Sequence, residues 1–203
     1  MIDAARWLAV LLHCGVRTLT AKEWAPLFEL HIQPDRFSLG LREIDDFVAQ
    51  VLHETGRLEH LTENLNYRAE RLMEVWPKRF PNRSIAAQYQ WRPEALANFV
   101  YGGRMGNDHE GDGFKYLGRG IPMVTGKANY KLLQDLTGLP LVDFPSMLAQ
   151  PEHALRCAVL WWEKKVPDSA IDTLERVTRA VNGGLNGIED RRMLARKAAE
   201  ALP

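Results

Sequence analysis

The chain has 203 residues and a mass of 23.1 kDa, which fits one domain with at most a small lobe rather than a string of modules. Lys plus Arg and Asp plus Glu number 26 each, so the formal net charge is zero. Proteins that bind nucleic acid usually carry a basic field, because phosphate neutralisation supplies most of their affinity. This composition therefore disfavours nucleic acid as a partner and favours a neutral substrate.

Apolar residues recur at helical spacing through most of the chain, which predicts a mainly α fold because strand-type alternation is scarce. The amphipathic segments cover 2–12, 24–32, 44–52, 154–162 and 171–181. The chain shows no internal repeat and no linker composition. We therefore predict one domain over residues 1–203, with a small helical lobe within roughly 66–100.

Local signals mark several ends of these helices. Thr20 with Glu23 has the spacing of a capping box at a helix start. Pro151 suits the first turn of a helix, and Gly183 suits the end of the helix that contains Val181.

The N-terminal segment and the cysteines predict a cytoplasmic product. The apolar run from Trp7 to Leu12 is far shorter than the roughly 20 residues of a membrane span. No small-residue cleavage site of a signal peptide follows it. Cys14 and Cys157 form no disulfide framework, although the sequence leaves one bridge between them open.

Glu54 is the first candidate for chemistry. It lies at the end of the 44–52 helix and about 20° from Phe47 on a 3.6-residue wheel. It should therefore sit near the apolar face and be partly desolvated, a setting in which a glutamic acid can act as a general acid. The alternative is a solvated glutamate at a helix end.

A second carboxylate, Glu63, follows nine residues later. On one unbroken helix the two would lie on opposite faces, so they can cooperate only if the chain turns, and Gly56 can supply that turn. Paired glutamates separated by room for one water are the apparatus of inverting glycoside hydrolysis.

The sequence does not favour a metal site. His53-Glu54 begins like a zinc-protease helix, but Arg57 stands where the second histidine is required. The acidic loop residues 108–112 lack the spacing of a calcium loop. We expect neither a metal nor another cofactor.

Two later segments have the residue types that bind sugars. Residues 116–130 combine glycines with a hydroxyl at Thr125, an amide at Asn129 and a ring at Tyr130. Residues 179–192 read as a helix end, an Asn-Gly turn and a new helix, for which a plain turn is the alternative interpretation.

Taken together, residues 44–191 resemble the family 19 glycoside hydrolases, which are chitinase-like enzymes with a lysozyme-type fold, and within them the phage and prophage endolysin branch. The resemblance rests on three motifs in the family's order: HETGRLEHLTENLNY, YLGRGIPMVTGKANY and VNGGLNGIEDR. One departure is Met123, at a position where relatives have a glutamine that contacts sugar.

The resemblance implies a role for each matching residue. Glu54 matches the general acid, Glu63 the general base, and Thr125 the residue that helps hold the attacking water. Arg191 matches the arginine that pairs with the catalytic carboxylates. The remaining expected sugar contacts are Tyr67, Tyr116, Asn129, Tyr130 and Asn182.

The resemblance thus implies a lysozyme-like α-helical fold whose two lobes flank a substrate cleft, and a bacteriolytic glycoside hydrolase that cuts the β-1,4 backbone of peptidoglycan. We expect a monomer that binds peptidoglycan strands and stays in the host cytoplasm until a holin releases it to the periplasm. Three alternatives remain open: a chitinase acting on chitin oligomers, a lytic transglycosylase and a non-catalytic glycan-binding protein.

Overall fold

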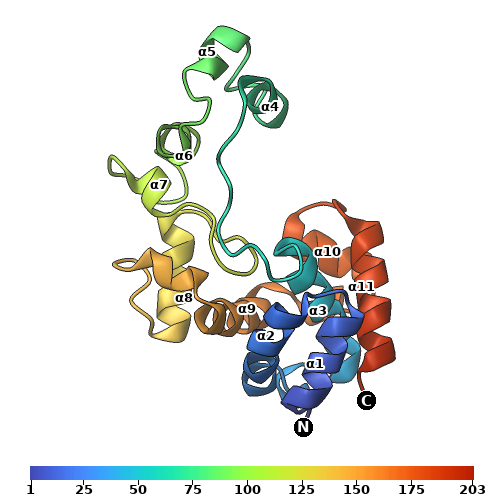
Figure 1. Cartoon of the computed structure of the whole chain (residues 1–203). Helices are drawn as coiled ribbons and strands as arrows, with labels where there is room; N and C mark the ends of the chain where they lie inside the picture. The colour runs from blue at the N-terminus through green and yellow to red at the C-terminus, as the bar shows by residue number, and fades with distance from the viewer. The chain divides into compact units, whose positions relative to one another are not determined.

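The structure is a computed structural model that describes all 203 residues, and it is built from helices (Figure 1). The only β pairing is two isolated bridges, Thr62 with Arg119 and Arg119 with Val124. The predicted mainly α fold is confirmed. The α-helices are α1 Ala4–His13, α2 Thr18–His31, α3 Leu41–Glu54, α4 Ala69–Val75, α5 Arg83–Ala87, α6 Pro93–Tyr101, α7 Asp112–Lys115, α8 Lys127–Thr137, α9 Pro151–Lys165, α10 Leu174–Asn182 and α11 Ile188–Ala201. Three short 3-10 helices are η1 Pro34–Arg36, η2 Pro145–Ala149 and η3 Asp168–Ala170.

The chain divides into two compact units. Unit 1 comprises Met1–Leu61, Gly120–Met123 and Met147–Pro203. Unit 2 comprises Thr62–Arg119 and Val124–Ser146, and it includes the segment 66–100. The chain thus enters unit 2 after Leu61, returns briefly to unit 1 over Gly120–Met123, re-enters unit 2 at Val124 and leaves it within η2.

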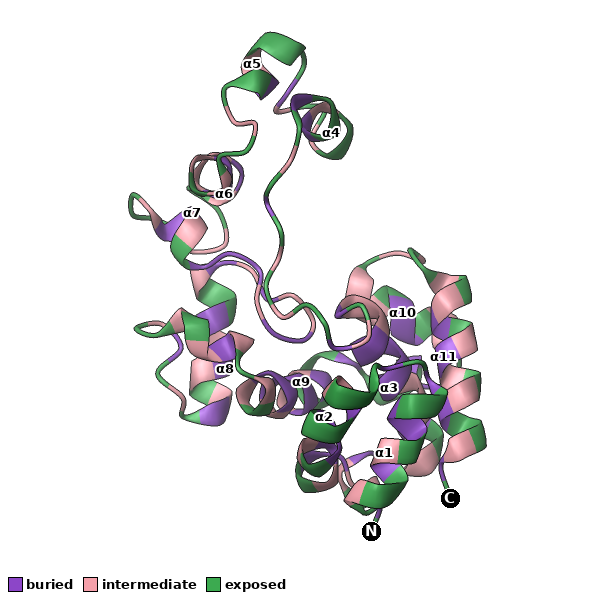
Figure 2. Cartoon of the chain, viewed as in Figure 1, coloured by how far each residue is buried: buried purple, intermediate pink, exposed green.

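The core of unit 1 forms around α3. The predicted stripe on this helix is buried, with Ile44, Val48 and Leu52 fully covered. Helix α11 packs along α3, while α1 packs against both α2 and α11. Figure 2 shows the buried sides of α3 and α11 as purple segments, in keeping with apolar faces packed on a common core.

Helix ends follow some of the local signals and not others. Pro151 opens α9, and Gly183 ends α10 with a φ of 73°, so both predictions are confirmed. The capping box at Thr20 is wrong, because α2 already begins at Thr18 and the Thr20 hydroxyl donates instead to Glu59. A tertiary partner 39 residues away has overridden the local signal.

Unit 2 has its own core, in which aromatic side chains take a large part. The ring of Phe80 makes contacts with Trp76, Tyr89 and Phe99 at centroid distances of 6.3, 5.6 and 5.4 Å. Trp76 also meets Tyr67 edge to face at 5.6 Å. These contacts join the segments that follow α4 and α5 to α6, and each of these helices is too short to be stable alone.

Both cysteines, Cys14 and Cys157, carry free and buried thiols, so the bridge left open by the sequence is absent. Burial raises the pKa of the Cys14 thiol to about 11 and that of Cys157 to about 12, which keeps both in the unreactive protonated form. None of the helices has the length and apolar content that crossing a bilayer requires.

Asp46 on α3 places a carboxyl group in an unfavourable setting. Burial, and then the negative charges of Asp45, Glu175 and Glu43, raise the pKa of Asp46 to about 7. The folded state therefore binds a proton at Asp46 more tightly than the unfolded chain. The protonated form of Asp46 is the one that the fold tolerates. The stability of the fold is therefore not reduced by Asp46 below about pH 4, and it falls as the pH rises toward 7 and the carboxyl group becomes charged.

We predict that Asp46→Asn raises the free energy of unfolding at pH 8 by on the order of 2 kcal/mol and has little effect at pH 4. Urea unfolding at both pH values measures this difference. Asp135→Asn, which removes an exposed partner of Lys131, is the control and should change stability little at either pH. Equal effects of Asp46→Asn at both pH values would contradict the assignment.

Candidate active site

The predicted site residues fall into two groups, one in each unit. Glu54, Asn182 and Arg191 belong to unit 1, and Tyr67, Tyr116, Thr125, Asn129 and Tyr130 belong with Glu63 to unit 2.

Glu54 is the last residue of α3, where the chain reverses direction. Gly56, Arg57 and Leu58 all have φ between 56° and 68°, in the left-handed region. Residues other than glycine adopt this region at a cost of about 1 kcal/mol each. The Thr55 hydroxyl holds the turn by donating to the carbonyl of Val51 and accepting from the amide of Leu58. The turn predicted at Gly56 is therefore present and is wider than one residue.

The carboxylate of Glu54 is held by a buried arginine. Arg191, which is 1% exposed, donates from Nη2 to Oε1 of Glu54 at 2.5 Å and from Nη1 to Oε1 of Gln50. Gln50 in turn donates to the hydroxyl of Thr178 on α10 at 3.2 Å. This chain of contacts fixes one oxygen of Glu54 and leaves Oε2 without a protein hydrogen bond.

A second set of contacts clamps the start of α11 beside Arg191. Asp190 receives hydrogen bonds from His53 at 2.7 Å and Arg57 at 2.6 Å. Burial alone would raise the pKa of Asp190, but these two partners outweigh it and hold that pKa below its ordinary value. A Cβ at Gly187 would lie 2.1 Å from the His53 ring, so only glycine fits at position 187, where the backbone crosses this ring.

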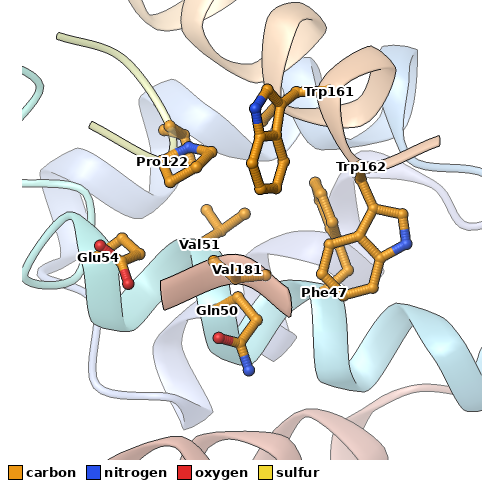
Figure 3. A pocket seen from close by; sticks show the side chains of 10 residues that line it. Phe47, Gln50, Val51, Glu54, Pro122, Trp161, Trp162 and Val181 are labelled. Atoms are coloured by element: carbon orange, nitrogen blue, oxygen red, sulfur yellow. The ribbon is translucent and has the colours of Figure 1, made fainter. Parts of the chain in front are cut away.

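A small apolar pocket adjoins Glu54 within unit 1. Figure 3 shows Trp161 and Pro122 on one side of it and the Gln50 amide pointing away from them. Its volume of about 10 Å³ is the space of one water molecule or methyl group. Val181 also lines it, and the next residue, Asn182, has a buried amide nitrogen without a hydrogen-bond partner in the protein.

Glu63 is oriented by two donors in unit 2. The amide of Gly118 donates to Oε1 at 2.5 Å, and the Tyr101 hydroxyl donates to Oε2 at 2.9 Å. Burial, the negative charge of Glu63 and the hydrogen bond to it raise the pKa of Tyr101, so the phenol keeps its proton and remains a donor. Each carboxylate oxygen still has a lone pair for a water molecule.

Thr125 lies beside Glu63 across Gly118. A Cβ built on Gly118 would be 3.1 Å from both the Glu63 carboxyl carbon and the Thr125 hydroxyl oxygen. Glycine at this position therefore lets both polar groups approach the same backbone. Asn129 is exposed, and its side-chain amide donates to the Thr125 carbonyl at 2.8 Å.

Two expected sugar contacts need correction. Tyr116 and Tyr130 have no exposed surface, and their hydroxyls donate to the carbonyls of Val142 and Leu117. Their rings pack on each other at 5.4 Å and support the backbone around Gly118 instead of forming a sugar-binding surface. Arg191, expected to pair with the catalytic carboxylates, does bond Glu54, and its burial leaves it no surface for direct contact with sugar.

The acidic loop 108–112 is held by partners within the protein. Asp112 is paired with Lys127 at 3.3 Å and also accepts from the amide of His109. Asn107 holds the preceding loop by donating to the Tyr101 carbonyl and accepting from the Lys127 amide.

Sequence reasoning missed Tyr101, Gln50 and the amide of Gly118. Gln50 stands one turn before Glu54, so a polar residue on an otherwise buried face was an available signal. Tyr101 and Gly118 approach Glu63 from 38 and 55 residues away, and no local pattern encodes such contacts.

A helical fold with two separately oriented glutamates fits the class of acid-base glycosidases. A "Glycosyl hydrolase family 19 domain-containing protein" of Haemophilus influenzae is 38% identical over 152 residues, which cover 74% of this chain and 75% of that protein. The chain therefore belongs to glycoside hydrolase family 19 and is a glycosidase. An endochitinase of Arabidopsis thaliana is 37% identical over 73 residues, 36% of this chain and 26% of that protein. No family model matches the chain.

Solved structures share the fold. Chitinase C from Streptomyces griseus HUT6037 aligns with a TM-score of 0.57 and 18% identity, covering 98% of this chain and 76% of that one. Another bacterial family 19 chitinase aligns with a TM-score of 0.50 and 18% identity, covering 97% and 84%. The predicted lysozyme-like fold is confirmed.

We predict that Arg191→Lys lowers the free energy of unfolding by about 2 to 4 kcal/mol, because an ammonium group cannot serve Gln50 and Glu54 together in a buried site. The neighbouring Arg192→Lys, at an exposed ion pair, should cost about 1 kcal/mol or less. Guanidinium unfolding of both variants gives the comparison. Equal losses in the two would refute the role assigned to Arg191.

For Tyr101→Phe we expect a tenfold or larger fall in kcat on glycan substrates with little change in melting temperature, because Glu63 loses one of its two orienting donors. Tyr89→Phe is the matched control, since its ring stacks on Phe99 in the same core. Steady-state kinetics would argue against the assignment if both variants kept the parent kcat.

Proposed function

We propose that the chain is an endolysin-type hydrolase that cuts the β-1,4 glycan backbone of bacterial peptidoglycan with inversion at the anomeric carbon. The observation that carries the proposal is the pair of glutamates, each fixed through a carboxylate oxygen by a donor that cannot easily move. Such preorganisation is what acid-base catalysis on a neutral sugar requires.

In the proposed mechanism Glu54 is the general acid. Its Oε2, the oxygen without a protein partner, gives a proton to the bridging oxygen as the bond to the anomeric carbon breaks. Glu63 is the general base and takes a proton from a water that Thr125 helps to hold. That water attacks the anomeric carbon from the opposite face, so one bond forms as the other breaks.

The mechanism sets a geometric requirement on the enzyme with substrate bound. The two carboxyl groups must stand about 6.5 to 9.5 Å apart, with the sugar and one water between them. Approach of Glu54 in unit 1 and Glu63 in unit 2 to that spacing is part of the proposal. The buried, unpartnered amide of Asn182 supports sugar binding near Glu54, because a ligand oxygen would satisfy it.

Peptidoglycan is proposed as the substrate because the motif around Glu63 resembles the endolysin branch of the family. Chitin is the second candidate, since the Arabidopsis relative and the Streptomyces neighbour are named as chitinases. Release of soluble fragments from each polymer by the same preparation separates the two. We further propose that the enzyme acts as a monomer and reaches the cell wall from the cytoplasm through a holin-type lesion.

Glu54→Gln and Glu63→Gln should each lower kcat by at least 100-fold, because general acid and general base catalysis contribute about 10² to 10⁴ each. Glu59→Gln is the control: this glutamate lies between the other two in sequence, is exposed, and bonds Arg17 and Thr20. Turnover of purified peptidoglycan, with circular dichroism to verify folding, measures the effect.

Two outcomes of this experiment would overturn the mechanism. If folded Glu54→Gln keeps more than a few per cent of parental activity, Glu54 is not the acid. If activity is insensitive to Glu63→Gln and the products carry anhydro-muramic ends, the enzyme is a lytic transglycosylase instead.

A further inference from the structure

Trp91 in unit 2 is exposed and its backbone is strained. Its exposed fraction is 53%, and its φ of 57° lies in the left-handed region that a bulky side chain rarely adopts. Strain of this kind persists where neighbouring contacts over-determine it, and it concentrates at binding and catalytic sites. A large apolar ring held in solvent at such a position calls for a function.

Two hydrogen bonds fix this segment against the start of α4. The amide of Trp91 donates to the carbonyl of Tyr67 at 3.1 Å, and the side chain of Gln90 accepts from the amide of Ala69 at 3.0 Å. The Tyr67 ring is itself braced edge to face by Trp76. The indole is therefore carried by a rigid support.

The indole borders a hollow that adjoins the one at Glu63. A hollow of about 500 Å³ is lined by Asn66, Tyr67, Arg68 and Trp91, together with Glu70, Arg71 and Glu74. Asn66 also lines a hollow of about 400 Å³ that contains Glu63. Because both hollows belong to unit 2 and share this residue, one extended ligand can occupy both.

One cation beside Trp91, Arg68, forms no ion pair, although its charge helps to lower the pKa of Glu70 in the same hollow. Glu74 is paired with Arg71 at 2.8 Å, and Glu70 is paired with Arg83 at 2.9 Å. Arg68 takes part in none of the ion pairs of the structure and is exposed. A guanidinium group in this position suits a carboxylate on the ligand.

We propose that Trp91, Tyr67 and Arg68 form a distal glycan subsite for a carboxylate-bearing peptidoglycan strand whose scissile sugar lies at Glu63. The apolar face of one sugar stacks on the indole, and Arg68 binds the carboxylate of its lactyl group or stem peptide. The inference rests on the proposed function and adds a reason for preferring peptidoglycan, because chitin is neutral and has no group for Arg68.

Binding to the full chain with both Glu54→Gln and Glu63→Gln tests the subsite apart from catalysis. Calorimetry uses three probes of equal length: uncrosslinked strands with stem peptides, the same strands after an amidase has exposed the lactyl carboxylate, and chitin oligomers. Trp91→Asn removes the ring but tolerates the left-handed backbone. Phe144→Ala, at a ring 60% exposed elsewhere in unit 2, is the control.

Trp91→Asn should weaken binding of the strands at least tenfold while its melting temperature stays equal or rises, and Trp91→Phe should retain most of the affinity. In the active enzyme Trp91→Asn should raise KM on long strands with kcat within about twofold. Parental affinity of Trp91→Asn, or an equal loss in Phe144→Ala, would overturn the subsite.

Arg68→Gln tests the carboxylate contact. It should weaken the binding of strands that carry a carboxylate about fivefold and leave the binding of chitin oligomers unchanged. Comparison of the amidase-treated strands with the untreated strands shows whether the carboxylate belongs to the lactyl group or to the stem peptide. Equal effects on all three probes, or none, would overturn this contact.

If the parent enzyme cleaves peptidoglycan and Glu63→Gln abolishes cleavage while Trp91→Asn binds normally, the subsite alone fails. If the parent does not cleave peptidoglycan, the proposed function fails.

Discussion

The buried guanidinium of Arg191 is the constraint on which unit 1 depends. A charge removed from water must find partners, and here they come from α3, as the carboxylate of Glu54 and the amide of Gln50. Packing of α11 against α3 brings them together, and the His53–Asp190 contact holds the adjacent turn of α11. The orientation of the proposed acid is thus a consequence of how two long helices pack.

Unit 2 orients its glutamate by a different device. The backbone amide of Gly118 and the phenol of Tyr101 hold Glu63, and neither is a charged group. The absence of a side chain at Gly118 lets Glu63 and Thr125 share one face of the backbone. The buried rings of Tyr116 and Tyr130 pack beside that segment, so residues expected to contact sugar instead support the proposed base indirectly.

Periodicity in the sequence predicted the buried stripe of α3, and a glycine stop signal predicted the end of α10. The resemblance of three motifs to family 19 indicated the family. Two kinds of feature escaped it. Contacts between distant segments, such as Tyr101 with Glu63, have no local pattern, and the exposure of a ring depends on everything packed around it. The sequence alone therefore could not show that Tyr116 and Tyr130 are buried and that Trp91 is exposed.

The central claim, single displacement by two glutamates, is tested most directly by the anomeric form of the product. Purified peptidoglycan or a soluble β-1,4 oligomer is digested with the parent enzyme, and fresh reducing ends are followed by proton NMR before mutarotation. The account predicts that α-anomers appear first, because water enters from the face opposite the leaving group. Initial β-anomers, or products without reducing ends, would contradict it.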